Sequence, residues 1–238
     1  MYRKRVTVLV GHFGSGKTEV ALNGALHLAA DGARVTLADL DVVKPYFRSR
    51  AAREILAEAG VELLAPTGAN AHSDLPIIVP QIRSHLRQSD RRMVMDVGGD
   101  EVGARVLGSL SDVVPVGETD CWLVLNFRRP STPDPERALE MVREIEAVGR
   151  LQVSGLISNT HLMEETTPAI VLDGYDRAVE TAQMADIPVL AVTVTEDIAA
   201  DLRDEDIKCP VVPIHRIVKP PFAQNLERRT TGPLFVVN

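Results

Sequence analysis

The chain alternates between short apolar runs and longer segments whose apolar residues recur at helical spacing. Arg5–Val10 is rich in β-branched and apolar residues, which predicts a buried strand. After a glycine-rich turn, Thr18–Ala30 has the spacing of a helix that packs on a core. The same pattern predicts strands at Arg34–Leu40, Val61–Leu64, Arg92–Val97, Cys121–Phe127, Val153–Ser158, Pro188–Val194, Val211–Ile214 and Pro233–Val237, and helices at Arg48–Ala59, Pro76–Ser89, Gly103–Leu110, Pro133–Val148 and Gly174–Ala185.

The alternation of strands and helices predicts an α/β fold. We expect a doubly wound, mostly parallel sheet with helices on both faces, which is a three-layer α/β/α arrangement. The chain contains no linker, internal repeat or low-complexity segment, so residues 1–238 are expected to form a single domain. Ligands of such sheets bind at the carboxyl ends of the strands, and functional residues should therefore follow strands directly.

Composition excludes some classes of function. The chain has 238 residues and a formal net charge of -7, which does not indicate a general attraction to nucleic acid or to an anionic membrane. Its two cysteines, Cys121 and Cys209, form no CxxC pair and no local Cys/His cluster. This usage is typical of a cytoplasmic protein and argues against a zinc or iron–sulfur site within one chain. No apolar stretch is long enough to cross a membrane.

The turn after the first predicted strand matches the phosphate-binding pattern GxxxxGK[ST] and lies between a strand and a helix. It reads Gly11-His12-Phe13-Gly14-Ser15-Gly16-Lys17-Thr18. Glycines allow the backbone N–H groups of such a loop to turn inward around an anion, and the following helix adds its positive end. We therefore expect Lys17 to reach the β- and γ-phosphates of a nucleotide and the Thr18 hydroxyl to bind Mg²⁺. This loop, Gly11–Thr18, is called the phosphate loop below.

Acidic residues follow two other predicted strands. Asp39 and Asp41 end the second strand, and Asp96 begins the DxxG string Asp96-Val97-Gly98-Gly99 after a later one. Glycine at position 99 would let a backbone N–H approach the γ-phosphate. We expect Asp96 and Asp41 to position Mg²⁺ and the attacking water, with Asp39 next to the ion but not directly bound to it. The predicted catalytic residues are thus Lys17, Asp41 and Asp96, and the predicted metal site is Thr18, Asp39, Asp41 and Asp96.

Together these motifs resemble the MinD/ParA/CobQ group of SIMIBI-class P-loop NTPases. The resemblance extends from Val6 to Asp197 and adds two weaker matches on the base side, Asn159 and Glu196-Asp197. It implies ATP and Mg²⁺ as ligands and an adenine contact at Asn159. The residues expected to contact the nucleotide are those of the phosphate loop together with Glu19, Gly99 and Asn159.

The phosphate loop departs from this group at two positions. The group has the pattern KGGxGK[ST], whose first lysine reaches the nucleotide of a partner subunit, whereas this chain has His12 and Phe13 there. Either the dimeric mechanism differs, or another cation such as Arg48 or Arg50 replaces the lysine. The strings Leu40–Arg50 and Asp96–Arg105 are similar to those of a smaller bacterial subfamily of ATP-binding proteins.

Besides a non-enzymatic sensor that binds ATP tightly without turnover, three functions agree with these motifs. The first is a slow Mg²⁺-dependent ATPase that acts as a nucleotide switch and forms a homodimer or docks on a protein partner through Lys44–Arg50 and Asp100–Arg105. The second is a small-molecule kinase or ATP-dependent ligase, as in the dethiobiotin-synthetase-like branch, with Arg48, Arg50 and Arg128 around the acceptor. The third is a GTPase metallochaperone. Guanine-specific relatives have an NKxD or TKxD string, which the segment Asn159–Leu162 lacks, so ATP is favoured over GTP.

Overall fold

The computed structural model describes residues 1–41, 50–65, 80–99, 101–203 and 206–217. Its strands are β1 (Val6–Val10), β2 (Val35–Leu40), β3 (Glu62–Leu64), β4 (Arg92–Val97), β5 (Thr119–Leu125), β6 (Gly155–Ser158), β7 (Val189–Val194) and β8 (Val211–Pro213). Its helices are α1 (Lys17–Ala30), α2 (Arg50–Glu58), α4 (Glu101–Ser109), α5 (Pro135–Gly149), α6 (Pro168–Ala185) and α7 (Glu196–Asp201), with 3₁₀ turns η2 (Val116–Glu118) and η3 (Met163–Glu165). Residues 80–86 are also helical.

Within these ranges the strands form one eight-stranded sheet in the order β3-β2-β4-β1-β5-β6-β7-β8. Every neighbouring pair of these strands is parallel. The expected doubly wound α/β sheet is confirmed, but it is parallel throughout the described residues and not mostly parallel. The reason is that each connection between successive strands contains a helix. The helix carries the chain back to the end of the sheet at which the previous strand began, so the next strand runs in the same direction.

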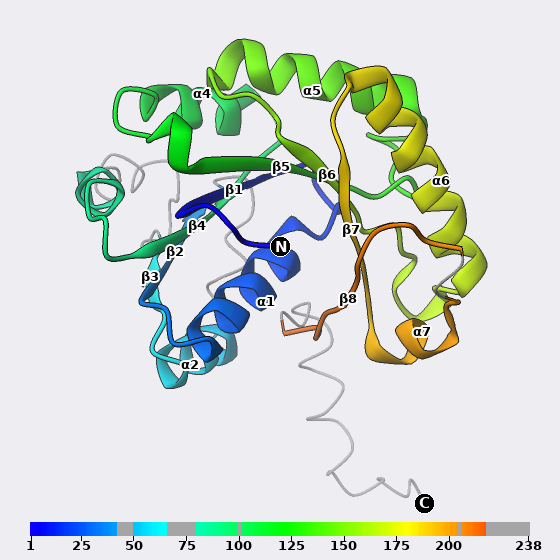
Figure 1. Cartoon of the computed structure of the whole chain (residues 1–238), viewed down its shortest axis with the longest axis horizontal. Coiled ribbons are helices and arrows are strands. Elements are labelled where there is room, and N and C mark those ends of the chain that lie inside the picture. Colours follow the sequence, from blue (N-terminus) through cyan, green and yellow to red (C-terminus); the bar gives the residue numbers. More distant parts are fainter. Residues whose placement is uncertain (42–49, 66–79, 100, 204–205, 218–238) are drawn as a thin grey trace, which may run out of the picture.

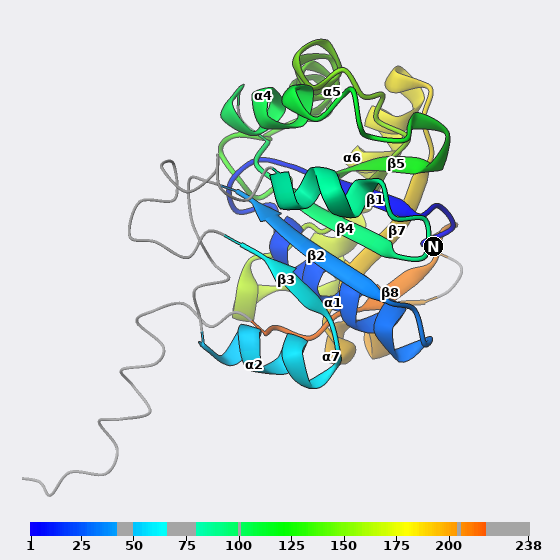
Figure 2. The same ribbon diagram turned by 90° about the vertical axis from the view of Figure 1, so that its left-hand side faces the viewer.

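Side chains of each strand alternate between two cores. Val6, Val8 and Val10 of β1 face the core beneath α4, α5 and residues 80–86, whereas Leu9 faces the core beneath α1 and α2. Figures 1 and 2 show these helices on opposite sides of the sheet. Burial on both faces explains why the strands read as continuous apolar runs and not as alternating ones.

Strand order defines where the ligand crevice lies. β1 has β4 on one side and β5 on the other, so the chain winds away from β1 in both directions. The loops that follow β1, β2, β4, β5 and β6 meet at the same carboxyl edge because all these strands are parallel. In open α/β sheets this reversal point is the usual ligand-binding crevice.

Two long helices begin with recognisable caps. Asp134 caps α5 by accepting a hydrogen bond from the Arg137 N–H at 2.8 Å, and Thr167 caps α6, with proline in the first turn of each helix. Helix α6 begins at Pro168, six residues before Gly174, where the sequence predicted its start. Thr167 and Pro168 form a helix start, and the spacing of apolar residues alone did not reveal it. Glu196-Asp197, the second of the two base-side matches, opens the short helix α7. The predicted strand at 233–237 lies outside the described residues.

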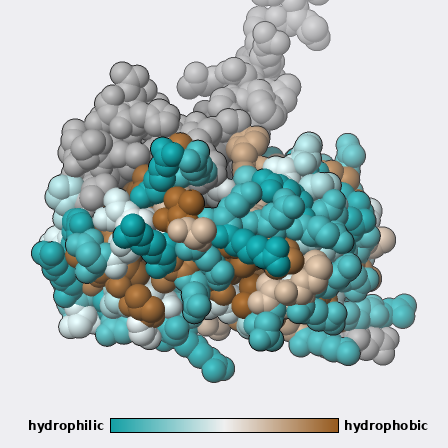
Figure 3. All heavy atoms as spheres, turned by 90° about the horizontal axis from the view of Figure 1, so that it is seen from above, coloured by the Kyte–Doolittle hydropathy of each residue, from teal (hydrophilic) through white to brown (hydrophobic). Residues whose placement is uncertain are grey.

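The outer surface of the helix layer over α4 and α5 is mostly hydrophilic, with small hydrophobic areas between (Figure 3). Val102 of α4 and Val148 of α5 are among its exposed apolar side chains. The layer is therefore amphipathic, as expected for helices that pack one side on a sheet. In the part of the chain that the structure describes, no helix has the length and apolar character needed to cross a membrane.

Candidate phosphate-binding site

The phosphate loop joins the end of β1 to the start of α1. Gly14 and Gly16 have φ values of 82° and 84°, a backbone conformation that favours glycine, and Ser15 N–H donates to the His12 carbonyl at 3.1 Å. No side chain caps the N-terminus of α1, and the residue at the cap position is Gly16. The first N–H groups of α1 are thus left for an anion, as the motif predicts.

Two side chains of α1 reach acids on neighbouring strands. Lys17 forms a buried ion pair with Asp41 directly after β2, and the Thr18 hydroxyl donates to Asp96 Oδ2 at 2.6 Å at the end of β4. Asp39 Oδ1 accepts a hydrogen bond from the Asp41 N–H at 3.1 Å. All five residues are buried. The structure therefore brings together the lysine, threonine and acids that the sequence placed in one catalytic and metal site.

Burial and mutual repulsion shift the titration of this cluster. Burial raises the pKa of Asp39 well above its usual value, and the nearby charge of Asp96 raises it further. Burial also raises the pKa of Asp96, although Lys17 and the Thr18 hydroxyl oppose the shift. For Lys17 burial acts to lower the pKa, but the carboxylates of Asp96, Asp41 and Asp39 outweigh it and the net pKa is raised. One lysine faces three acids, so the cluster favours a further cation.

A divalent cation suits the chemistry of these atoms. Asp96 Oδ1 is buried without a hydrogen-bond partner among the described residues, and Thr18 offers a hydroxyl beside the other oxygen. Within the described ranges, no group of three or more His, Cys, Asp and Glu side chains is arranged to hold a metal ion. Mg²⁺ usually keeps several waters and binds through one or two protein oxygens plus substrate phosphates. Thr18 and Asp96 fit that mode, in which the nucleotide completes the site.

The glycine of the DxxG string touches the phosphate loop directly. Gly99 N–H donates to the Gly11 carbonyl at 3.0 Å. A Cβ on Gly99 would lie 2.3 Å from the carbonyl carbon of Gly11 and 2.6 Å from the His12 nitrogen. Only glycine allows the two loops to approach this closely, which links the end of β4 mechanically to the phosphate loop.

Loops after β5 and β6 support the other side of the phosphate loop. Asn159 Nδ2 donates to the Ser15 carbonyl at 2.7 Å, while its Oδ1 accepts from the Thr193 hydroxyl at 2.9 Å. Asn126 Nδ2 lies within hydrogen-bond distance of two carbonyls, those of Gly14 and His161, each at 3.2 Å. Asn159 is buried against the loop, and its contact with adenine stays a prediction. The sequence assigned no role to Asn126, because the strand predicted there, Cys121–Phe127, included it, whereas in the structure it directly follows β5.

Three residues that were expected to contact the nucleotide, Glu19, Phe13 and His12, also contact other parts of the chain or the solvent. Glu19 Oε2 accepts a hydrogen bond from the Ile217 N–H at 3.1 Å, so this side chain holds the segment that follows β8. Phe13 is 56% exposed at the tip of the phosphate loop. His12 is partly buried and borders a hollow of about 450 Å³ whose other lining residues include Ser131, Asp134 and Arg137. The loop thus has an exposed aromatic side chain and an adjoining hollow.

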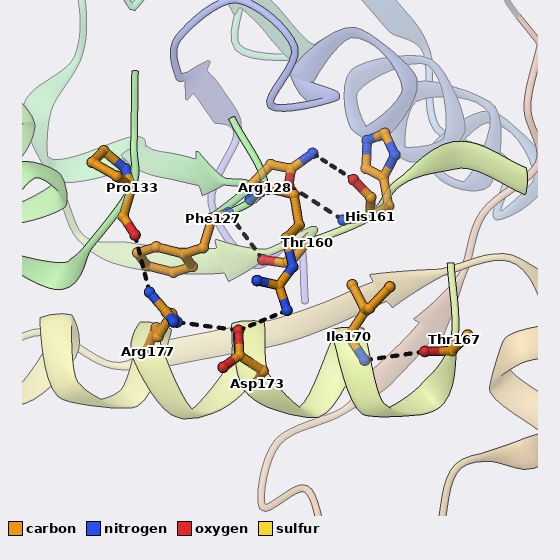
Figure 4. Close-up of polar contacts among 10 residues, drawn as sticks. Phe127, Arg128, Pro133, Thr160, His161, Thr167, Ile170, Asp173 and Arg177 are labelled. Carbon is orange, nitrogen blue, oxygen red and sulfur yellow. Dashed lines mark hydrogen bonds and ion pairs between the residues drawn. The ribbon is translucent and has the colours of Figure 1, made fainter. Parts of the chain in front are cut away.

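The arginine expected to hold an acceptor substrate points elsewhere. Arg128 pairs with Asp173 of α6 at 3.2 Å, and Arg177 shares the same carboxylate at 3.1 Å (Figure 4). Arg128 thus already has an acidic partner on the next helix, and a contact of its guanidinium with an acceptor stays a prediction. Arg48 lies outside the described residues, as does most of the predicted partner segment Lys44–Arg50.

The second predicted partner segment, Asp100–Arg105, is described except for its first residue. Glu101 and Arg105 form an exposed i,i+4 ion pair at 2.5 Å on α4. Pairs of this kind stabilise a helix only slightly, so both side chains can change partners at little cost. A role of this segment in docking stays a prediction.

His161, which follows β6 in the loop that begins at Asn159, lies beside the phosphate loop. Its Nε2 is 3.5 Å from the position that a Cβ on Gly16 would occupy, and the side chain is partly buried. Burial lowers its pKa to about 4, with further contributions from the charges of Arg129 and Arg216. The imidazole is therefore neutral at neutral pH.

This shift has a measurable consequence for stability. The folded-state pKa of His161 lies below its usual value of 6.5, so its stabilising contribution is present above pH 6.5 and is lost as pH falls towards 4. Thermal unfolding followed between pH 7 and about pH 4 should show a steeper loss of stability for the native chain than for His161→Gln. His27→Gln, on the exposed face of α1, is the matched control and should follow the native chain. Parallel curves for the native chain and His161→Gln would contradict this assignment.

Comparison with known proteins supports the fold. No protein-family model matches the chain, and no curated protein matches it. Among solved structures, chloroplast FtsY from Physcomitrella patens is 21% identical with a TM-score of 0.54, over 82% of this chain and 60% of that one. Cell division protein FtsY from Thermotoga maritima is 18% identical with a TM-score of 0.54, over 81% and 62%. The signal recognition particle receptor FtsY from Elizabethkingia anophelis is 20% identical with a TM-score of 0.50, over 88% and 63%.

The chain thus spans about three fifths of the length of these FtsY structures. It shares the three-layer α/β/α fold of these FtsY structures, which confirms the fold predicted from the sequence motifs. At this degree of identity the similarity establishes the fold and not the activity.

Proposed function

We propose that the chain is a Mg²⁺-dependent ATP-binding protein of the MinD/ParA/CobQ-like group that hydrolyses ATP slowly and acts as a nucleotide switch. The observation that carries this proposal is the buried cluster in which Lys17 and Thr18 of the phosphate loop meet Asp41 and Asp96. These residues come from α1 and from the ends of β2 and β4. A phosphate-binding loop faces acids of this kind where phosphoryl transfer is arranged by positioning and electrostatics.

Each side chain has a defined task in this proposal. Lys17 donates to the terminal phosphates, and Thr18 with Asp96 would hold Mg²⁺, which neutralises charge that develops on the phosphates. Asp41 positions the attacking water. The Gly99 N–H donates to the Gly11 carbonyl of the phosphate loop. A γ-phosphate that shifts the start of this loop would therefore also shift Gly99, so that the end of β4 senses the phosphate.

The switch rests on a change of partner by Lys17. Its ammonium is bound to Asp41 in the structure, and a phosphate of a bound nucleotide would compete for the same donors. Binding of ATP would therefore release Asp41, which lies three residues before the start of the proposed partner segment Lys44–Arg50. An ion pair inside the site would in this way report the presence of nucleotide to a neighbouring chain, either a second copy or another protein.

Titration calorimetry with ATP, ADP and GTP, each with and without Mg²⁺, tests the proposal. We expect ATP and ADP to bind, Mg²⁺ to strengthen the binding, and ATP to be hydrolysed slowly in a phosphate-release assay. No binding of any nucleotide would reject the function as a whole. Tighter binding of GTP than of ATP would reject the choice of base, which rests on the missing guanine string at Asn159–Leu162.

The hollow beside His12 supports a second candidate, a small-molecule kinase or ligase. Its volume of about 450 Å³ suits a small ligand, and it adjoins the phosphate loop. A metabolite screen for ATP turnover separates the two candidates. Strong stimulation by one small molecule would favour the kinase or ligase, whereas stimulation by a protein partner or by self-association would favour the switch.

A further inference from the structure

The turn after β5 places Arg129 against the phosphate loop. Its Nε–H donates to the Gly14 carbonyl at 3.0 Å. A Cβ added to Gly14 would lie 3.0 Å from both Cδ and Nε of this arginine, so the glycine leaves the room that the side chain needs. An arginine within contact of the loop backbone is well placed to reach an anion held by the same loop.

This turn is held in place at several points. Arg129 N–H donates to the Asn126 carbonyl at 3.1 Å, and Thr132 N–H donates to the Arg129 carbonyl at 3.0 Å. Phe127 N–H donates to the Thr160 hydroxyl at 3.2 Å, and Arg128 binds Asp173 of α6 (Figure 4). Because the residues on both sides of Arg129 are fixed, its side chain starts from a defined position and not from a solvated loop.

No acid among the described residues neutralises the charge of Arg129. Among the described residues it forms no ion pair, and its two Nη groups form no hydrogen bond. Arg128, Arg137 and Arg216 are by contrast all paired with acids. The guanidinium is partly buried and contributes to the lowered pKa of His161, which places its positive field beside the phosphate loop.

The buried acids create a need for such a cation. Asp39, Asp41 and Asp96 face a single lysine, so the cluster is formally negative before any nucleotide binds. A nucleotide adds several negative charges, and Mg²⁺ with Lys17 compensates only part of the total. A guanidinium is suited to this task because it stays protonated and presents paired donors to phosphate oxygens.

We infer that Arg129 is a nucleotide-binding residue whose Nη groups donate to the phosphate chain, as a second protein cation after Lys17. The inference rests on the proposed function, since it needs a nucleotide in the phosphate loop. The Nε–H bond to Gly14 then orients the guanidinium, and the donors on Nη remain for phosphate oxygens. The carbonyl of Gly14 keeps its contact with Asn126 if Arg129 is removed, so the loop itself should persist.

The test compares Arg129→Met, Arg129→Lys and the control Arg143→Met, an exposed position on α5. Affinities for ADP and ATP are measured with Mg²⁺ at two salt concentrations, together with the melting temperature of the nucleotide-free proteins. We expect Arg129→Met to lower both affinities roughly tenfold to a hundredfold, because the charge-assisted hydrogen bonds from Arg129 to the phosphates are lost. The nucleotide affinity of Arg129→Met should also depend less on salt, and its melting temperature should stay within a few degrees of the native value. Arg129→Lys should recover part of the lost affinity.

Two outcomes would overturn the inference while leaving the proposed function intact. One is Arg129→Met binding ADP and ATP as tightly as the native chain does. The other is a loss of affinity that is accompanied by a large fall in melting temperature and is not recovered by Arg129→Lys. That result would mean that Arg129 only stabilises the phosphate loop. A native chain that binds no nucleotide would instead reject the proposed function itself.

Discussion

Lys17→Met is expected to abolish measurable nucleotide binding and also to destabilise the nucleotide-free protein. The ammonium supplies the charge that phosphates need, and it neutralises Asp41 in a pair whose side chains are only 5% and 8% exposed. Removing one partner of a buried pair leaves the other charge uncompensated, which costs about 3–5 kcal/mol. Titration calorimetry measures the first effect, and urea unfolding measures the second.

A double variant separates these two effects. Lys17→Met combined with Asp41→Asn removes both charges of the pair, so most of the lost stability should return. ATP binding should not return, because no cation replaces Lys17 in the loop. Normal ATP affinity in the double variant would refute the assignment of Lys17 to the phosphates. Continued instability would show that Lys17 chiefly compensates Asp39 and Asp96, which also raise its pKa.

Gly99→Ala is expected to eliminate nucleotide binding through a purely steric effect. The added methyl group would lie 2.3 Å from the Gly11 carbonyl carbon and 2.6 Å from the Gly11 oxygen, far inside van der Waals contact. Backbone cannot yield as a flexible side chain does, so either the phosphate loop or the end of β4 must move. ATP affinity and the melting temperature should therefore both fall sharply, which calorimetric titration and thermal unfolding measure.

Gly117→Ala is the matched control for this substitution. Gly117 lies in η2, and a Cβ there would meet nothing within 4 Å. The control should keep native affinity and stability to within about 0.5 kcal/mol, as surface substitutions usually do. Native-like ATP binding by Gly99→Ala would mean that the close approach of the DxxG string to the phosphate loop is not needed for nucleotide binding.

The sequence by itself determined the fold class and the set of residues that gather around Lys17. Strands buried on both faces produce continuous apolar runs, and the residues that follow parallel strands must meet at one edge. This made Lys17, Thr18, Asp41 and Asp96 recognisable as one cluster before any distance was known. The start of α6 was missed because its cap residues, Thr167 and Pro168, come before the apolar pattern begins.

Only the tertiary structure decided which residues support the phosphate loop from the other side. Asn126, Arg129 and His161 are more than 100 residues from Gly14 in the sequence, and they reach the loop because β5 and β6 follow β1 in the sheet. The tertiary structure also pairs Arg128 with Asp173 and lets Glu19 accept a hydrogen bond from the Ile217 N–H, which no local motif indicated. Local motifs specify a loop and its adjacent helix, whereas the charges that complete a site depend on strand order and side-chain packing, which no short stretch of sequence encodes.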